Sequence, residues 1–456
     1  FCFFFFFFLC GGVVFLVVFF FFGGGGGGWG GGVVGGFGVV SVMKMYSLRN
    51  FFALQKNMLV LLGMVILVGM GEKMAERFLP LYLVALGGGA LSVGLLNGMD
   101  NLLSALYSFP GGVLSDRLGY KRALAVFNLL AMAGFLIVIL IPSWQAVIVG
   151  SVFFISWTAI SLPATMSMIS QILPQNKHTM GVSMHSLVRR IPMALGPVFG
   201  GLMITQWGEV TGVRWSFIAA FVLGGVSLVF QQAMIEEKKN TPTQATANPI
   251  HAIRNISPDL RRLLVSDILI RFCEQIPYAF VVLWAVNIVG VTPAQFGVLT
   301  AIEMATAMLI YIPVAYLADK TEKKPFVLIT FGFFTLFPLV LWFSQSFGWL
   351  VIAFIVRGLK EFGEPTRKAL IMELCPEGQK ASTFGAYYLV RDVVVSIAAF
   401  GGAFLWQMSP AVNFFTAFGF GLIGLGGFAV FGWGVVGLSL VYFKRNIKTG
   451  LYLKAD

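Results

Sequence analysis

Stretches of about 20 residues with few or no charges recur along almost the whole of this 456-residue chain. Each stretch is long enough to cross roughly 30 Å of hydrocarbon as a helix. The strict alternation of a barrel strand is absent, and backbone groups within lipid must bond inside their own segment, so helices are expected. A mean hydropathy of +0.88 is too apolar for a soluble protein of this length. The sequence therefore predicts an all-α integral membrane protein.

The apolar stretches divide into two groups of six. A polar segment at 236–262, rich in Pro, Thr and Asn, separates an amino-terminal bundle at 43–235 from a carboxy-terminal bundle at 263–443, and a tail at 444–456 follows. The expected spans are 57–85, 91–114, 121–142, 145–173, 178–205, 213–235, 263–290, 294–318, 325–346, 348–374, 379–407 and 411–443.

The net charge of +12 follows the same division. Lys and Arg gather in alternate loops, whereas the intervening loops 86–89, 142–145 and 206–214 carry only Arg214. By the positive-inside rule the basic loops and both ends of the bundle lie in the cytoplasm, which requires an even number of spans. We therefore expect a multi-pass protein of the plasma or inner membrane, with the lipid bilayer and not nucleic acid as the partner of its basic charge.

Residues 1–42 are of low complexity, with Phe-rich and Gly-rich runs. We interpret them as an artefact or a flexible apolar tail outside the natural protein. The alternative is a thirteenth span over Phe1–Phe22, which is long enough to cross a membrane.

The two bundles repeat each other. Residues 94–116 match 297–319 at an offset of 203, which aligns Asp100 with Glu303, and 162–190 match 364–392 at an offset of 202, which aligns Arg189 with Arg391. Duplicated halves that meet at the membrane midplane are typical of alternating-access carriers.

A charged loop after the second span carries a family resemblance. Its residues are Gly112, Leu114, Asp116, Arg117, Gly119, Tyr120, Lys121 and Arg122. This loop resembles the signature loop of the major facilitator superfamily, whose members are twelve-helix secondary transporters. The resemblance implies that the loop closes a cytoplasmic gate through Asp116, with a reduced copy in the other half at Asp319. The alternative is a topogenic anchor that only holds the loop in the cytoplasm.

Ionisable side chains within spans are costly and usually face a cavity. Four carboxylates are candidates for proton coupling, namely Asp100, Glu303, Glu76 and Glu274. Glu76 and Glu274 have basic residues at helical spacing, Lys73 and Arg271, so self-neutralising pairs are the alternative for them. For Asp100 and Glu303 the alternative is a partner Arg on a neighbouring helix.

A second group of residues is expected to line a substrate cavity. It comprises Arg189, Arg357, Glu361, Arg391, Tyr278 and Trp284. In the tenth span Arg357, Lys360, Glu364 and Arg367 form one helical stripe, which either lines the cavity or forms an internal salt-bridge lattice. The cavity is favoured for Arg357 and Glu361, and the lattice for Arg367 and Lys368.

The segment ALGPVFGG at 194–201 resembles the fifth-span motif of drug/proton antiporters, although Pro192 and Ser183 stand where that motif has glycine. The resemblance implies a pliable joint at Gly196, Pro197, Gly200 and Gly201 and favours export. The alternative is ordinary close packing of small residues.

These observations predict a proton-coupled exporter of a small organic solute, acting as a monomer. The alternatives are a carrier that takes up or exchanges an organic anion bound by Arg189, Arg357 and Arg391, and a membrane sensor that does not transport. The four cysteines and three histidines are dispersed, so no metal site and no cofactor are expected. No nucleotide-binding or hydrolase motif is visible, so an enzyme is not expected.

Overall fold

The computed structural model describes residues 4–10, 13–19, 56–154, 157, 161, 165, 178–234, 257–318, 322–375 and 380–450. These fall into two units, Phe1–Phe51 and Phe52–Asp456. In the first unit β1 (Phe4–Cys10) pairs antiparallel with β2 (Val13–Phe19), so that Phe4 lies opposite Phe19. This segment forms strands and not the alternative helical span, which agrees with the β-propensity of Phe and Val.

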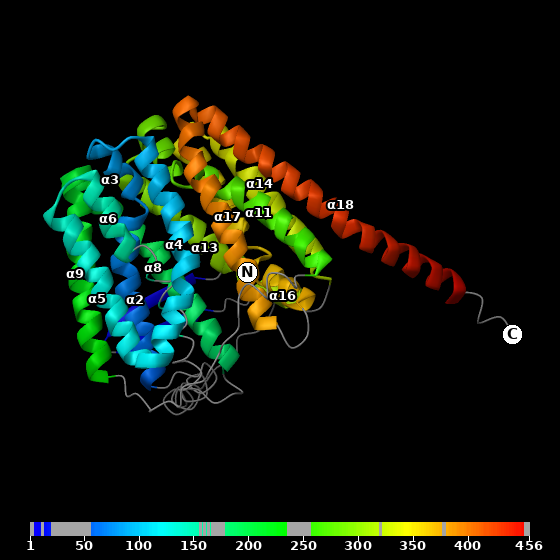
Figure 1. The fold of residues 1–456 in the computed structure, drawn as a ribbon, viewed down its shortest axis with the longest axis horizontal. Helices are drawn as coiled ribbons and strands as arrows, with labels where there is room; N and C mark the ends of the chain where they lie inside the picture. The colour runs from blue at the N-terminus through cyan, green and yellow to red at the C-terminus, as the bar shows by residue number, and fades with distance from the viewer. Residues whose placement is uncertain are drawn as a thin grey trace, which may run out of the picture. The chain divides into compact units, whose positions relative to one another are not determined.

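The second unit is helical throughout its described elements (Figure 1). Its amino-terminal half contains α2 (Lys56–Glu76), α3 (Leu79–Ala85), α4 (Ala90–Leu118), α5 (Tyr120–Leu140), α6 (Trp144–Phe154), α8 (His178–Trp207) and α9 (Glu209–Met234). Most of 155–177, in the expected fourth span, and residues 235–256 of the expected linker lie outside the described residues.

The carboxy-terminal half follows the same plan. It contains α11 (Pro258–Tyr278), α12 (Val281–Leu283), the π-helix η2 (Trp284–Ile288), α13 (Pro293–Ala318), α14 (Lys324–Phe343), α15 (Phe347–Leu359), α16 (Glu364–Leu374), α17 (Lys380–Met408) and α18 (Pro410–Gly450). Because α18 continues to Gly450, the beginning of the expected tail at 444–456 is helical. With broken helices joined, each of the twelve expected spans contains at least part of a described helix, and the fourth is described mainly over α6.

Three of the expected spans are broken rather than continuous. The first breaks at Arg77–Phe78, the seventh at Ala279–Phe280 and the tenth at 360–363. Prolines accompany each break: Pro80 in the first turn of α3, Pro277 before the second break and Pro365 in the first turn of α16. Proline removes a backbone donor and crowds the preceding turn, which explains why these helices end there.

The repeat is visible in these breaks. The first and seventh spans break 202 residues apart, and the glycines that end them, Gly87 and Gly290, lie 203 residues apart with φ values of 84° and 82°. Such positive φ angles are readily adopted only by glycine. The aligned halves therefore share a broken helix that ends in the same kind of turn.

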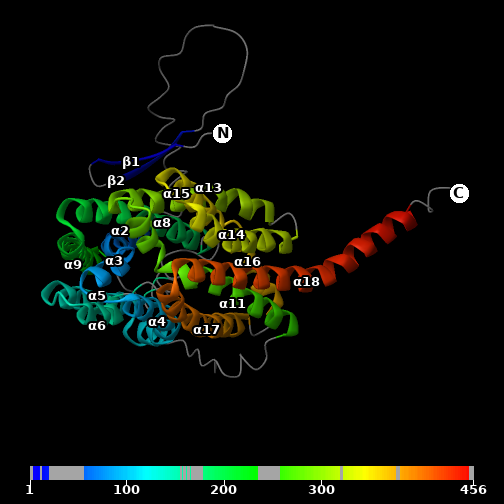
Figure 2. The same ribbon diagram turned by 90° about the horizontal axis from the view of Figure 1, so that it is seen from above.

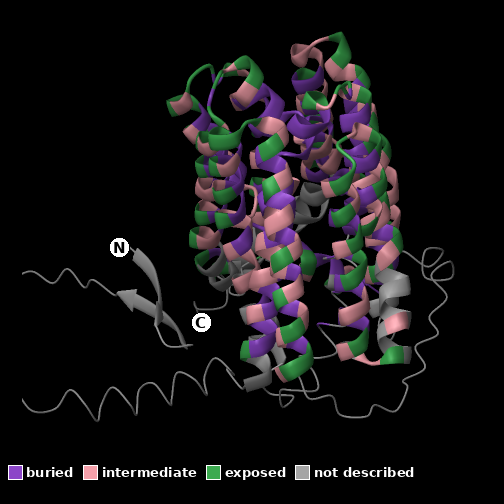
Figure 3. Ribbon diagram, turned by 90° about the vertical axis from the view of Figure 1, so that its left-hand side faces the viewer, coloured by how far each residue is buried: buried purple, intermediate pink, exposed green. Residues whose placement is uncertain are grey.

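Apolar side chains cover the outward faces of the helices. Val229, Ile397 and Leu140 are 70%, 68% and 66% exposed, and exposed residues lie along the outer sides of the helices in Figure 3. A soluble protein rarely exposes so much apolar surface. Among the described helices, six are long and apolar enough to cross a membrane, and a seventh is formed if the bent pair α11–η2 counts as one span.

The halves meet along two helix pairs, α8 with α13 and α4 with α17 (Figure 2). We call the end of the bundle with the connections 86–89, 141–143, 208, 289–292, 344–346 and 409 the short-loop end, and the opposite end the linker end. Near the short-loop end a Cβ atom on Gly297 would lie 2.3 Å from the Pro197 carbonyl oxygen, and one on Gly201 would lie 2.3 Å from that of Pro293. The backbones of the two halves therefore touch at this end.

Candidate functional site

A central cavity lies where the first and seventh spans break. Glu76, Arg77 and Asp100 line it from the amino-terminal half, and Tyr278 and Arg357 line it from the carboxy-terminal half. Leu79, Pro80, Leu96, Val281, Val282 and Phe296 supply apolar wall. A mostly apolar cavity with a few charged groups, placed between two halves, is the usual form of a small-molecule site.

Asp100 differs from the other three candidate carboxylates. In the described part of the chain its only polar contact is a weak one, from the Ser104 hydroxyl at 3.5 Å, and no cation lies within ion-pair distance. Glu303, which the repeat aligns with Asp100, is almost fully buried and lies 3.3 Å from Arg357 Nε and 3.6 Å from Lys360 Nζ. The alternative of a partner Arg therefore holds for Glu303 and not for Asp100.

Arg77 and Tyr278 join the halves across the cavity. The Arg77 guanidinium donates a hydrogen bond of 3.0 Å to the Tyr278 hydroxyl and lies over the Tyr278 ring, with its Cζ 5.3 Å from the ring centre. The Arg357 guanidinium lies over the same ring at 5.4 Å. Arginine stacks favourably on aromatic faces, so these contacts hold both cations at the cavity wall.

A group of three charges separates the central cavity from a second one. Lys73 Nζ bonds to Glu76 and lies 3.2 Å from Glu72. Glu76 lines the central cavity, whereas Glu72 and Lys73 line the second, together with Trp157, Ser161, Thr165, His185 and Arg189. The self-neutralising pair of Lys73 and Glu76, given above as the alternative, is therefore present, and Arg189 belongs to a cavity within the amino-terminal half.

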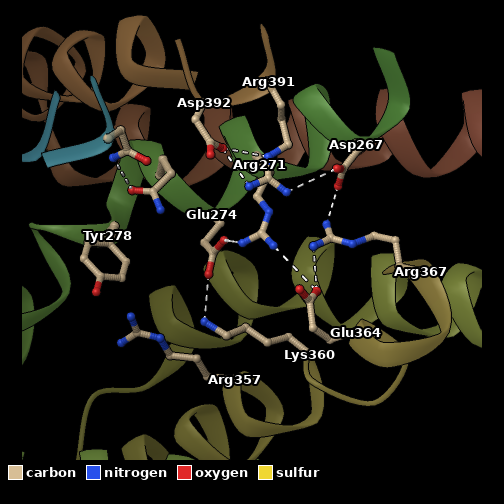
Figure 4. Close-up of polar contacts among 12 residues, drawn as sticks. Asp267, Arg271, Glu274, Tyr278, Arg357, Lys360, Glu364, Arg367, Arg391 and Asp392 are labelled. Carbon is tan, nitrogen blue, oxygen red and sulfur yellow. Dashed lines mark hydrogen bonds and ion pairs between the residues drawn. The ribbon is translucent and has the colours of Figure 1, made fainter. Parts of the chain in front are cut away.

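The carboxy-terminal half contains a continuous salt-bridge lattice (Figure 4). Glu274 bonds to Arg271 at 2.6 Å and to Lys360 at 2.7 Å, and Glu364 lies 3.6 Å from Arg271. Buried charges persist when each is paired and hydrogen-bonded, as here. This lattice includes the pair expected for Arg271 and Glu274.

Asp267 holds the linker-end part of the lattice together. It is fully buried, bonds to Arg367, accepts a 3.0 Å hydrogen bond from the Tyr387 hydroxyl and lies 3.6 Å from Arg391. Arg391 also bonds to Asp392 at 2.7 Å. Arg391 was expected in the cavity but is not among the residues that line either cavity described here.

The charged stripe expected on the tenth span is divided by the break at 360–363. Arg357 on α15 lines the central cavity, and Arg367 on α16 belongs to the lattice, bonding Glu364 at 2.6 Å. Glu361, within the break, pairs at 2.9 Å with Arg190 of the other half. Lys368 is half exposed and lies 3.4 Å from Glu364. Helix periodicity placed these residues on one stripe, but the break redirects them to separate partners.

The remaining candidates lie away from the central cavity. Trp284 is buried in η2 against Trp342 and Phe414, with ring centres 5.3 and 5.2 Å apart.

The glycines of the fifth span lie at close helix contacts. A Cβ atom added to Gly196 would lie 2.7 Å from the Cβ of Lys73, and one added to Gly200 would lie 2.0 Å from the Met74 carbonyl oxygen. Thus Gly196 and Gly200 pack α8 against α2, while Pro197 and Gly201 pack it against α13.

The predicted gating loop is described only in part. Gly112, Asp116 and Arg117 fall within α4, and Asp319 and the side chains of Asp116 and Arg117 lie outside the described residues. Gly119 has φ 83° and precedes α5, as a sharp turn requires. Lys121 donates to the Gln232 carbonyl at 2.9 Å, and Arg122 is exposed.

Comparison with known families decides the identity of the fold. The model of the Major Facilitator Superfamily matches residues 61–273 and again 263–445, once for each half. The chain belongs to the major facilitator superfamily. Its members are transporters and not enzymes, and the chain is accordingly a multi-pass membrane transporter.

Its relatives are distant. The chain is 22% identical over 377 residues to an uncharacterized MFS-type transporter of Methanocaldococcus jannaschii, which covers 80% of this chain and 92% of the relative. It is 24% identical over 190 residues to the quinolone resistance protein NorA of Staphylococcus aureus, which covers 42% of this chain and 48% of NorA.

Solved structures share the fold of this superfamily member. The nucleoside transporter NupG superposes with a TM-score of 0.68 at 14% identity, covering 82% of this chain and 99% of NupG. A peptide transporter POT in complex with sulfate gives a TM-score of 0.66 at 17% identity, covering 82% and 93%. At these identities the similarity is one of fold.

Sequence reasoning did not select several residues at the junction of the halves. Arg77 lines the cavity, and Asn97 and Asn101 donate to the Gln275 carbonyl at 3.0 Å and to its side-chain oxygen at 3.2 Å. A signal for Arg77 was present, because Lys73, Met74, Pro80 and Leu81 occupy its helical neighbour positions and none can neutralise it. Asn97 and Asn101 share a helix face with Asp100, but polarity alone does not reveal which side a helix face meets.

Proposed function

We propose that this transporter is a proton-coupled exporter of a small amphipathic organic solute, working by alternating access. The observation that carries the proposal is the position of Asp100, a carboxylate in the central cavity whose ionised form has no cationic partner among the described residues. An unpaired charge in such surroundings is costly, so a proton or a positively charged solute would be bound there in turn. Competition for one carboxylate links solute movement to proton movement.

The direction of transport and the orientation are supported by sequence. By the positive-inside rule, the basic loops favour a cytoplasmic position of the linker end. Among the described residues, close backbone approaches between the halves lie at the short-loop end, which supports loading of the cavity from the opposite, linker end. The partial similarity to NorA, whose name describes quinolone resistance, favours export over uptake.

The alternative of a carrier for organic anions bound by Arg189, Arg357 and Arg391 has less support. That site requires the three arginines to converge, but Arg357 lines the central cavity, Arg189 lines the second cavity and Arg391 lies in the lattice. Arg391 is moreover paired with Asp267 and Asp392.

The test uses the full chain reconstituted in liposomes with a quinolone and a lipophilic cationic dye as probes. We expect an imposed pH gradient to drive accumulation of a probe by the wild type. Asp100→Asn should abolish this response and leave a slower passive exchange of the probe down its own gradient, because the rest of the cavity remains but no proton is bound. The matched control is Asp259→Asn, an exposed carboxylate paired with Arg262 at the end of α11. If Asp100→Asn responds to the pH gradient as Asp259→Asn does, the proposal is wrong.

A further inference from the structure

The central cavity contains two guanidinium groups, one from each half. Arg77 follows the end of α2, and Arg357 lies near the end of α15. Their Cζ atoms lie 5.3 and 5.4 Å from the centre of the Tyr278 ring, and all three residues line the cavity. Both guanidinium groups are therefore held beside one ring at the cavity wall, and a guanidinium fork suits a carboxylate or phosphate oxygen pair.

The hydrogen-bonding capacity of these forks is largely unused within the protein. Arg77 bonds to the Tyr278 hydroxyl but to no carboxylate in the described part of the chain. Arg357 approaches Glu303 through Nε, and its two terminal nitrogens make no hydrogen bond to any described residue. A guanidinium has five donors, so several remain for a ligand. Elsewhere in the carboxy-terminal half, arginines of the lattice have carboxylates on their terminal nitrogens.

Asp100 brings the opposite charge to the same cavity. It lies on α4, lines the cavity with Arg77 and Arg357, and forms no ion pair with either of them. If Asp100, Arg77 and Arg357 served only to neutralise one another, we would expect their charged groups to be in contact, because opposite charges attract strongly where little water is present. They stand apart, with apolar residues such as Leu96, Val281 and Phe296 completing the wall.

We infer that the solute is amphoteric, with an anionic group held by Arg77 and Arg357 and a basic amine held by Asp100 across an apolar body. This inference rests on the proposed function and names the substrate class of the same cavity. A solute of this kind neutralises both ends of the site at once, whereas a singly charged analogue leaves one buried charge unpaired. Leaving a buried charge unpaired costs more than the missing contact alone.

Binding of the anionic group would also affect the position of the two halves relative to each other. Arg77 and Asp100 belong to one half, and Arg357 and Tyr278 to the other. An anion that bonds both arginines therefore favours the arrangement in which the halves are close together around it. A ligand shifts a conformational equilibrium only through such a difference in contacts.

The test compares three probes on the purified full chain by isothermal titration calorimetry. They are a quinolone that carries a carboxylate and a basic amine, its ethyl ester, which keeps only the amine, and its N-acetyl form, which keeps only the carboxylate. We expect the zwitterion to bind at least roughly 10-fold more tightly than either analogue, the size of one charge-assisted hydrogen bond. Equal binding of the three probes, or no binding of any, would overturn the inference.

Variants then assign the two ends of the solute. Arg77→Gln should weaken the zwitterion and the N-acetyl form by roughly 10-fold or more and leave the ester unchanged. Asp100→Asn should weaken the zwitterion and the ester and leave the N-acetyl form unchanged. Arg262→Gln, on the exposed surface of α11, is the control and should change none. If Arg77→Gln does not fold, Arg77→Lys, which keeps the charge but loses the fork, should weaken the same two probes less strongly.

The outcomes separate this inference from the proposed function. A wild type that couples a pH gradient to transport but binds the three probes alike retains the proposed function and refutes the amphoteric substrate. A wild type that prefers the zwitterion but transports without any response to pH retains the inference about the site and refutes proton coupling. An Arg77→Gln variant that weakens the ester as much as the zwitterion also contradicts the inference.

Discussion

The two halves of the molecule repeat each other in backbone but not in charge. In the carboxy-terminal half Glu274 and Glu303 are each enclosed by cations within 3.6 Å. In the amino-terminal half Asp100, the residue aligned with Glu303, has only the Ser104 hydroxyl as a polar contact in the described structure. Both halves thus have an acid at the aligned position, while the surroundings of the two acids differ.

This difference predicts that the paired acids contribute to stability and that the unpaired acid responds to ligands. A carboxylate fixed between two cations contributes to rigidity and gains little from binding a proton, because its charge is already balanced. A carboxylate without a cation has its charge balanced only by what enters the cavity. We therefore expect the lattice to hold the carboxy-terminal half in shape and Asp100 to respond to ligands, and mutations can test each half of this statement.

The largest effect is expected from Asp267→Asn. Asp267 is fully buried and contacts Arg367, Arg391 and Tyr387, so loss of its charge leaves two buried cations short of a partner. Removing one partner of a buried ion pair typically lowers the free energy of unfolding by about 3–5 kcal/mol. Thermal unfolding in detergent should show a large fall in the stability of the variant.

The control for this prediction is Asp259→Asn in the same helix, whose pair with Arg262 is 64% and 55% exposed. Exposed pairs contribute about 0–1 kcal/mol, so its unfolding temperature should hardly change. Equal stability of the two variants would show that the lattice is not what holds this half together.

A second comparison uses the aligned acids directly. Glu303→Gln should destabilise the protein by about 3 kcal/mol, because Arg357 loses its only carboxylate within ion-pair distance among the described residues. Asp100→Asn should change stability by less than about 1 kcal/mol, since no cation depends on it. Both variants are measured by thermal unfolding without ligand, and a larger loss for Asp100→Asn would reverse the roles assigned to the two acids.

The smallest effect is expected where the halves touch through charge. The pair of Arg190 and Glu361 is partly exposed, at 16% and 22%, and joins α8 to the break in the tenth span. Glu361→Gln should cost about 1 kcal/mol or less in stability. If the pair separates during transport, the same variant should change the transport rate in proteoliposomes more than it changes the unfolding temperature, and an unaltered rate would indicate that the pair does not separate.

Much of the fold could be predicted from the sequence because its strongest signals are local or periodic. Apolar length gave the spans, basic loops divided them, and the offset of about 202 residues between aligned segments gave the two halves. The breaks in the first, seventh and tenth spans were not predicted. Apolarity continues through a break, and proline is tolerated inside other helices here, such as Pro192 and Pro197 in α8.

The sequence predicted several residues of the site, but it did not predict which of them lie together. Asp100, Glu76 and Arg357 were selected as charged residues within spans and line the cavity, whereas Arg391 and Glu274 were selected as charged residues too and lie in the lattice. Charge within a span indicates an inward-facing position, and it does not indicate whether a neighbour on another helix neutralises that charge. For Arg77 the sequence shows the lack of an acidic helical neighbour, but only the structure shows that its side chain lies against Tyr278 of the other half.

The lattice of the carboxy-terminal half also has a consequence for electrical measurements. Apart from the half-exposed Lys368, the lattice contains four acids, Asp267, Glu274, Glu364 and Asp392, and four cations, Arg271, Lys360, Arg367 and Arg391, among the described residues. A body without net charge does almost no work against the membrane potential when it tilts, whereas one elementary charge that crosses the membrane does about 2.3 kcal/mol per 100 mV. Movement of the lattice itself would then contribute little to any current measured for this transporter.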